Sequence, residues 1–278
     1  MENTTYALAA LDMDGTLLNS RHAISPYTRR VLSRAAAAGK VIALCTGRCL
    51  SELWDHLESL PGVGYAICEN GGCLYDVAAG RVLCQQAIDD AAAERILNLA
   101  ARQDVCVQCF ISGQSYMQVA DIEAFRRYGI HDYAGVFLQG SKFVGDVRRY
   151  WRREGDMEKI NLYFTDQAEK AVFRRRLGEA DLNLADSLGT GYELSPRQAT
   201  KALGLAALCR HLALPVEQTM AVGDGGNDLE LMRAAGFSVA MGNATGQVRA
   251  AADAVTRDCD HDGAALAVEK YLLGSAEM

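Results

Sequence analysis

The chain has 278 residues, of which half are hydrophobic and 23% are charged. This length and composition are those of an ordinary globular protein with one large or two modest domains. It carries 28 basic and 35 acidic residues, a formal net charge of −7. Because an acidic protein repels polyanions through its general field, we expect neither nucleic acid nor a membrane surface as a partner.

Apolar runs and cysteines indicate the compartment. No apolar run approaches the roughly 20 residues of a membrane span, and the first residues lack the pattern of a signal peptide, so we expect a cytoplasmic protein. The nine cysteines are scattered and odd in number, as expected of reduced thiols. Cys106 and Cys109 have CxxC spacing, but in a strand-like segment positions three apart point to opposite faces. We therefore expect no redox or zinc role for this pair.

The first predicted element is a buried strand over residues 6–11, which ends in Asp12, Asp14 and Gly15. Two carboxylates at the end of a buried strand carry a desolvation and like-charge cost that packing does not explain. We therefore expect a cation near this pair. The two side chains are close enough to share a metal, or one could act as a nucleophile and the other as an acid/base. The alternative is a strand-to-loop turn in which Asp14 and Gly15 supply only turn chemistry.

After this first strand, the sequence alternates between helix and strand signals. Ser25 as N-cap, Pro26 at the first helical position and Gly39 after the last turn predict a helix. The continuously apolar residues 41–44 predict a doubly buried strand. A second helix is predicted to carry Leu50, Leu53, Trp54 and Leu57. This βαβα order implies a parallel sheet with right-handed crossovers.

The middle of the chain has a different pattern, which predicts an inserted α+β domain over residues 84–186. It combines polar helices with alternating strands, expected at 91–102, 105–111, 116–119, 160–164 and 167–177. The βα rhythm then resumes, with elements expected at 203–212, 220–222, 229–235, 238–241 and 264–273. We therefore expect an α/β fold, a doubly wound, mostly parallel Rossmann-like core made of residues 1–83 and 187–278, carrying the inserted domain.

Two further polar clusters follow predicted strands. Asp224, Asn227 and Asp228 stand in a glycine-containing segment after the strand at 220–222, and hard oxygen ligands from different strands suit Mg²⁺. The alternative for this segment is a turn that caps the next helix. Thr46 and Gly47 offer a hydroxyl and backbone N–H groups near a helix N-terminus, which is a suitable anion cradle. In a doubly wound sheet such clusters meet at the carboxyl ends of the strands.

In order and spacing these segments resemble the haloacid dehalogenase superfamily, specifically the Cof-type phosphatases with a class IIB cap. The four family motifs correspond to Asp12-x-Asp14-Gly15-Thr16, Thr46-Gly47-Arg48, Lys201, and Gly223-Asp224-x-x-Asn227-Asp228. Further matches are Glu69-Asn70-Gly71-Gly72, the run 239–244, and Asp262-Gly263. The resemblance covers residues 6–272. Two departures are Ala202, where the family usually has glycine after the lysine, and Cys259, where it often has asparagine.

The resemblance implies hydrolysis of a phosphate monoester through an aspartyl-phosphate intermediate with Mg²⁺ as cofactor. Asp12 would be the nucleophile and a metal ligand, and Asp14 the acid/base, with its backbone carbonyl on the metal. Asp224 would complete the protein's metal ligands, while Asp228 would orient Lys201. The transferring phosphoryl group would be surrounded by Thr46, Gly47, Lys201 and Asn227. We expect Arg48 to make a structural contact behind the site, and residues 70–72 to form a tight turn rather than part of it.

Three alternatives remain open at this point. A phosphomutase of the same fold would pass the phosphoryl group to a second hydroxyl, and a non-catalytic protein would only bind a phosphometabolite. A dinucleotide-dependent oxidoreductase fits the strand order, but no G-x-G-x-x-G follows the first strand. The expected partner is a small phosphorylated metabolite, with the inserted domain as a cap that selects the leaving group. The sequence indicates neither the substrate nor the oligomeric state.

Overall fold

The computed structural model describes residues 6–274, apart from the side chains of residues 153 and 154. The chain divides into two compact units. The first contains the residues up to Arg48, then Trp54–Cys84, then the residues from Thr200 onward, and the second contains Cys49–Leu53 and Gln85–Ala199. This division differs from the expected one at two points: the five residues Cys49–Leu53 belong to the second unit, and that unit extends to Ala199 instead of residue 186.

The first unit is built on an eight-stranded sheet with the order β14-β13-β12-β1-β2-β3-β4-β5. The pairs from β14 to β3 are parallel, and β4 is antiparallel to β3. The strands are β1 (Leu8–Leu11), β2 (Val41–Cys45), β3 (Tyr65–Cys68), β4 (Cys73–Asp76), β5 (Arg81–Gln85), β12 (Thr219–Gly223), β13 (Phe237–Ala240) and β14 (Ala254–Val255). The predicted mostly parallel core is confirmed.

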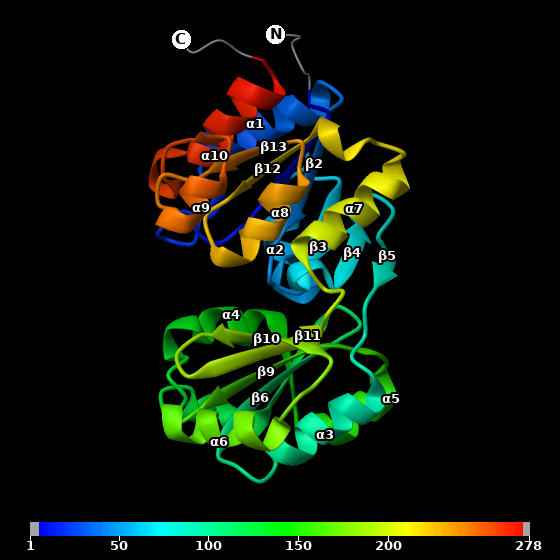
Figure 1. Cartoon of the computed structure of the whole chain (residues 1–278), viewed down its shortest axis with the longest axis vertical. Coiled ribbons are helices and arrows are strands. Elements are labelled where there is room, and N and C mark those ends of the chain that lie inside the picture. The colour runs from blue at the N-terminus through cyan, green and yellow to red at the C-terminus, as the bar shows by residue number, and fades with distance from the viewer. Residues whose placement is uncertain (1–5, 275–278) are drawn as a thin grey trace. The chain divides into compact units, whose positions relative to one another are not determined.

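Helices cover both faces of this sheet (Figure 1). On one face, α1 (Pro26–Ala37) packs against α10 (Gly263–Ala267) and the π-type turn Val268–Leu272 that continues it. On the other face, α7 (Lys201–Leu212) packs against α8 (Leu229–Ala234) and on the apolar side chains of β1, β2 and β12. The six-residue helices α2 (Trp54–Ser59) and α9 (Gly246–Ala251) belong to the same unit. The fold is therefore doubly wound, as expected.

Local signals explain where the long helices begin and end. The Ser25 hydroxyl accepts a hydrogen bond from the Thr28 N–H at 3.0 Å, Pro26 is the first helical residue, and Gly39 has φ +78 just beyond the end of α1. Thr200 caps α7 in the same way, accepting from the Leu203 N–H at 3.2 Å. Lys201 is therefore the first residue of its helix.

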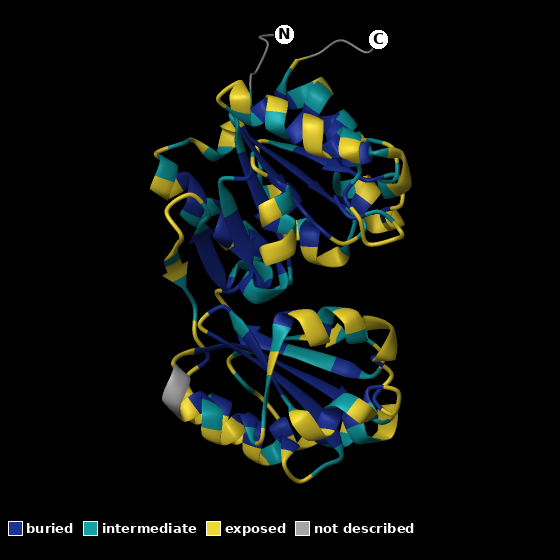
Figure 2. Cartoon of the chain, turned by 180° about the vertical axis from the view of Figure 1, so that it is seen from behind, coloured by how far each residue is buried: buried dark blue, intermediate teal, exposed yellow. Residues whose placement is uncertain are grey.

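The second unit is a six-stranded sheet with the order β10-β11-β9-β6-β7-β8. Its strands are β6 (Val105–Ile111), β7 (Gln114–Gln118), β8 (Ser141–Val144), β9 (Met157–Phe164), β10 (Leu182–Ser187) and β11 (Gly191–Pro196). One face of the sheet packs on α3 (Asp90–Ala100), α5 (Val147–Glu154) and α6 (Gln167–Leu177), and the other on α4 (Ala134–Gly140). Figure 2 shows the buried residues concentrated on the strands of each unit. The hairpin of β10 and β11 extends this sheet beyond residue 186, which explains the later boundary.

Cys106 and Cys109 lie on opposite faces of β6, as expected. Cys109 belongs to the hydrophobic cluster under α3 and α6, and Cys106 to the cluster under α4. All nine cysteines are free thiols. Burial raises the pKa of both thiols, which leaves them unreactive.

The second predicted helix is interrupted. A single 3₁₀ turn, Leu50–Glu52, precedes α2, which begins only at Trp54. The cause is tertiary, because the Ser51 N–H donates to the Gly113 carbonyl at 3.0 Å and the Ser51 hydroxyl donates to the Gly140 carbonyl at 2.7 Å. These bonds attach the segment Cys49–Leu53 to the second unit.

None of the helices within residues 6–274 combines the length and the apolar character that a membrane span requires.

Candidate active site

The candidate site lies at the carboxyl ends of β1 and β12, the two neighbouring strands at which the strand order reverses direction. Such a switch point is where doubly wound sheets bind ligands. Asp12 follows β1 and Asp224 follows β12, and the Asp12 N–H donates to the Val222 carbonyl at 3.0 Å. Both acids therefore leave adjacent strands at the same edge of the sheet.

Lys201 lies between two buried carboxylates. Its Nζ atom is 2.6 Å from Oδ1 of Asp12 and 2.6 Å from Oδ1 of Asp228. Lys201 is 1% exposed and Asp12 is 6% exposed. Burial alone would lower the pKa of Lys201, but the negative charges of Asp12 and Asp228 raise it. The lysine is thus held as an ammonium group.

Asp228 is bound entirely by groups of the protein. Its Oδ2 accepts hydrogen bonds from the N–H groups of Asp224 and Gly225 at 3.0 and 2.9 Å, while Oδ1 contacts Lys201. The residue is fully buried. This is the arrangement expected of a carboxylate that orients the lysine and the loop after β12.

Asp224 is held from two sides. Its Oδ1 accepts from the Thr16 hydroxyl at 3.1 Å, and its Oδ2 lies 3.3 Å from Nδ2 of Asn243, which also donates to the Gly15 carbonyl at 2.8 Å. Gly15 has φ +78, and a Cβ atom there would lie 2.5 Å from the Asp224 carboxylate. Only glycine therefore allows the turn after β1 to approach this acid.

Oxygen atoms of Asp12, Asp224 and Asp228 lie within 4.8 Å of one another. Burial raises the pKa of Asp12 and Asp224, and for both the neighbouring charge of Asp228 acts in the same direction. Three carboxylates against one ammonium leave an excess of negative charge in a largely dry place, which is costly without a cation. This hard oxygen donor set fits a magnesium-type divalent ion.

The carboxylate of Asp14 takes a different partner. Arg48 binds it at two points, with Nε 2.8 Å from Oδ2 and Nη2 2.6 Å from Oδ1. Burial by itself would raise the pKa of Asp14, but the hydrogen bonds and charge of Arg48 hold it below its usual range. The expectation that Arg48 makes only a contact behind the site is wrong, because its guanidinium contacts a candidate catalytic carboxylate.

The candidate phosphate-binding residues follow β2 and the loop after β12. Thr46 is buried at the end of β2, and its hydroxyl accepts from the Arg48 N–H at 3.1 Å. Asn227 donates from Nδ2 to Oδ1 of Asn70 at 3.1 Å, and a Cβ atom on Gly47 would lie 3.3 Å from the same Asn70 amide. Asn70 therefore stands among the candidate phosphate-binding residues. The expectation that it belongs only to a tight turn is wrong in this respect.

The turn after β3 also supports the lysine. Gly71 has φ +101, and a Cβ atom there would lie 2.0 Å from the Thr200 carbonyl oxygen. The backbone of this turn is thus packed against the residue that caps α7. Because Lys201 follows directly, Gly71 fixes the position from which the lysine reaches the two carboxylates.

Sequence reasoning missed the roles of Arg48, Asn70 and Asn243, although one signal was available for all three. Each follows a strand of the parallel part of the sheet: β2, β3 and β13, respectively. The carboxyl ends of parallel strands lie on one edge, so a polar residue after any of them is a candidate for the same site. The strand β3 itself was not predicted, which hid Asn70.

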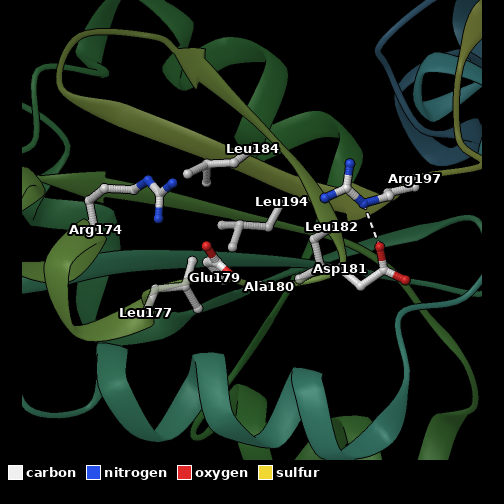
Figure 3. A pocket seen from close by; sticks show the side chains of 9 residues that line it. All are labelled: Arg174, Leu177, Glu179, Ala180, Asp181, Leu182, Leu184, Leu194 and Arg197. Carbon is white, nitrogen blue, oxygen red and sulfur yellow. Dashed lines mark hydrogen bonds and ion pairs between the residues drawn. The ribbon is translucent and has the colours of Figure 1, made fainter.

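A cavity of about 510 Å³ lies in the second unit, between α6 and strands β10 and β11 (Figure 3). Leucine side chains form its floor, and Arg174 and Arg197 lie at its two ends. Both arginines already have partners, since Arg174 donates to the Gly178 carbonyl at 2.7 Å and Arg197 pairs with Asp181. The cavity contains none of the candidate site residues.

The sequence and the fold of this chain match those of known proteins. Residues 9–268 match the haloacid dehalogenase-like hydrolase family. The chain is 30% identical to phosphatase YwpJ of Bacillus subtilis, covering 93% of this chain and 97% of that one. It is also 30% identical to the HMP-PP phosphatase of Serratia proteamaculans, covering 88% and 86%. A solved structure of a haloacid dehalogenase-like hydrolase from B. subtilis has a TM-score of 0.79 at 28% identity, covering 95% of this chain and 99% of that one.

The chain therefore belongs to the haloacid dehalogenase-like hydrolase family. Within that family it is a Cof-type phosphatase, and the curated relatives at 30% identity are named phosphatases. A subclass IIB sugar phosphatase of known structure has a similar fold, with a TM-score of 0.78. That last structure is 23% identical and supports the fold alone. The predicted family, fold class and enzyme class are thus confirmed.

Proposed function

We propose that this phosphatase hydrolyses small phosphate monoesters, sugar phosphates or phosphorylated cofactors, with Mg²⁺ and through an aspartyl-phosphate intermediate. One observation carries the proposal. Asp12 follows a buried central strand and pairs with Lys201, and its carboxylate oxygen lies within 4.8 Å of oxygens of Asp224 and Asp228. A carboxylate fixed in this way is a suitable nucleophile for in-line attack on phosphorus. The names of relatives that act on HMP-PP and on a phosphoribitylamino uracil support the substrate class.

Six residues of the site contact the reacting groups in this proposal. Asp12 attacks phosphorus as the bond to the ester oxygen breaks. Asp14, whose side chain is half exposed, takes up a proton from solvent and gives it to the leaving oxygen. Lys201 and the Asn227 amide, with Thr46 and Gly47, neutralise and position the phosphoryl group, which is most of the catalysis in phosphoryl transfer. Water then hydrolyses the aspartyl-phosphate, with Asp14 now acting as the base.

The carboxylates of Asp12 and Asp224, with the backbone carbonyl of Asp14, would hold Mg²⁺. A bound Mg²⁺ supplies charge neutralisation for the phosphoryl oxygens during transfer. The carboxylate of Asp14 is engaged by Arg48, so its backbone is the part we assign to the metal. We assign Asp228 to Lys201 rather than to the ion. The second unit is proposed to select the leaving group.

A phosphate-release assay over a panel of sugar phosphates and phosphorylated cofactors, with Mg²⁺ and with EDTA, tests this proposal. We expect release from several panel members with Mg²⁺ and none with EDTA. Chromatography of the products separates hydrolysis from transfer to a second hydroxyl. Absence of release from every panel member by folded protein in Mg²⁺ would contradict the proposal.

A further inference from the structure

The contact between Arg48 and Asp14 is a two-point contact between a planar guanidinium and a carboxylate. Nε and Nη2 of Arg48 each bind a different oxygen of Asp14, at 2.8 and 2.6 Å. Such a fork fixes the rotation of the carboxylate as well as its position. The Arg48 side chain is 13% exposed and that of Asp14 is 50% exposed, so the arginine is the more firmly enclosed partner.

The backbone of Arg48 is fixed on both sides. Its N–H donates to the Thr46 hydroxyl at 3.1 Å, and its carbonyl accepts from the Glu69 N–H at 2.9 Å. These bonds attach it to the ends of β2 and β3. The backbone of Arg48 is therefore fixed by the sheet independently of the contact between its guanidinium and Asp14. A surface ion pair between two flexible side chains has no such support.

Asp14 lies two residues after Asp12 in the chain, but the two carboxylates face different cations. Asp12 faces Lys201, while Asp14 faces Arg48. Among the described residues, the group of carboxylates that could share an ion contains Asp12, Asp224 and Asp228. The orientation of the Asp14 carboxylate is thus set by Arg48 and not by that group.

We propose that Arg48 is a positioning residue for Asp14, holding its carboxyl group in the orientation from which it protonates the leaving oxygen. This inference rests on the proposed function. In the step concerned, an oxygen of Asp12 forms its bond to phosphorus, the bond from phosphorus to the ester oxygen breaks, and the proton of Asp14 moves to that oxygen. Both carboxyl oxygens contact Arg48 in the structure. One of the two contacts therefore opens when its oxygen carries the proton, while the other contact keeps the carboxyl group in place.

Two substrates of nearly the same shape test the inference. Phenyl phosphate releases a phenol with a pKa of about 10, whereas 4-nitrophenyl phosphate releases a more acidic phenol that needs little protonation. A defect in proton donation therefore slows the first substrate more than the second. The quantity to compare is kcat/KM, because it covers transfer to Asp12 and excludes the later hydrolysis of the aspartyl-phosphate.

We expect Arg48→Gln to lower kcat/KM about tenfold or more for phenyl phosphate and less than about threefold for 4-nitrophenyl phosphate. KM for both substrates should stay close to the parental value. Arg48→Lys should recover part of the loss, since an ammonium group cannot reproduce the two-point contact. Arg34→Gln removes the Arg34–Glu269 pair, a 2.6 Å contact with a mostly exposed arginine, and serves as the matched control with no effect on either substrate.

The double variant Arg48→Gln/Asp14→Asn should be no slower on phenyl phosphate than Asp14→Asn alone, because the arginine acts through the aspartate. Equal losses on both substrates with a raised KM would overturn the inference, since they would mean that Arg48 binds the substrate itself. Unchanged kinetics in Arg48→Gln would overturn it as well. The proposed function fails separately, if the parental protein releases no phosphate or if Asp12→Asn still does.

Discussion

The ammonium group of Lys201 lies 2.6 Å from the carboxylate of Asp12, although 189 positions separate the two residues in the sequence. The contact exists because α7 packs on the apolar side chains of β1 and because this helix begins at Lys201 itself. It joins the first motif of the chain to the third.

Asp12→Asn should abolish turnover and leave the fold intact. The amide keeps the size of the side chain and an oxygen for Lys201, but it cannot form an acyl-phosphate. Phosphate release and circular dichroism of the purified variant check this expectation. Activity within about tenfold of the parent, roughly 1.4 kcal/mol of barrier, would refute Asp12 as the nucleophile.

Asp224→Ala should weaken Mg²⁺ binding more than Asp228→Asn does, because it removes a charged oxygen from a site with few ligands. Asp228→Asn retains an oxygen that can accept from the N–H groups of Asp224 and Gly225. Titration of activity with Mg²⁺ in both variants gives the order. The reverse order would show that the ligand is Asp228 and that Asp224 only supports it.

Asp228→Ala should destabilise the protein by about 3–5 kcal/mol, because it leaves the buried Lys201 with one carboxylate fewer and two N–H groups without an acceptor. Urea unfolding in EDTA measures this change. Asp132→Ala, at a carboxylate whose side chain is 81% exposed, is the control. Similar losses in both variants would contradict the assignment of Asp228 to the buried network.

Lys201→Met should lower kcat/KM on the order of 10²-fold or more, the scale of losing a preorganised charge partner, without abolishing Mg²⁺ binding. Ala202→Gly restores the usual family residue and should change activity little, because Thr200 already caps the helix and Lys201 is its first residue. Steady-state kinetics of the two variants decide the matter. Lys159, a buried lysine in β9 of the second unit, is the comparison. Near-parental activity in Lys201→Met, with loss in Lys159→Met, would show that the lysine has been misassigned.

Gly71→Ala should destabilise the protein by about 3 kcal/mol or more, since the new methyl group would meet the Thr200 carbonyl at 2.0 Å in a backbone with φ +101. Gly80→Ala is the matched control, because Gly80 also has positive φ but its nearest neighbour is the Tyr75 hydroxyl at 3.7 Å. There we expect only the cost of a left-handed residue, about 1–2 kcal/mol. Equal thermal shifts in the two variants would contradict the close packing of the turn.

Asp121→Asn should stabilise the protein at neutral pH. Burial raises the pKa of Asp121 in the folded state, so the folded protein binds its proton more tightly than the unfolded chain does. The stability contributed by the protonated form is present at low pH and is lost as pH rises through the folded pKa. The advantage of the asparagine, measured by urea unfolding, should therefore shrink as pH falls toward about 3.9, the ordinary value for aspartate. An advantage that grows toward low pH would contradict this sign.

The sequence predicted the elements whose signals are local. The capped helix that begins at Pro26, the apolar strand that begins at Val41 and the helix Gln167–Leu177 needed only periodicity and caps. The break at Leu50–Glu52 could not be predicted, because it depends on carbonyls of Gly113 and Gly140 far away in the sequence. Distant contacts override local helix preference there.

The acidic residues of the candidate site could be proposed from the sequence, because carboxylates at the end of a buried strand are unusual in a packed core. The partners of those acids could not, since Arg48 and Asn243 act through residues 34 and 19 positions away. Knowing which strands are neighbours is required before such residues can be paired. The sequence predicts that a helix connects β1 and β2. It does not predict which side chains lie close together at the carboxyl ends of these strands.

The assignment of Cys49–Leu53 to the second unit matters for anyone who exchanges that unit between relatives. A chimera that imports only residues 85–199 would place its junction across a set of native hydrogen bonds. Ser51 would face a foreign Gly140 and Ser115, and Glu52 a foreign Gln108. A graft that carries the pentapeptide along with residues 85–199 keeps these donors and acceptors from one parent. The transplantable module is therefore discontinuous, made of two pieces of chain separated by 31 residues of the host, Trp54–Cys84.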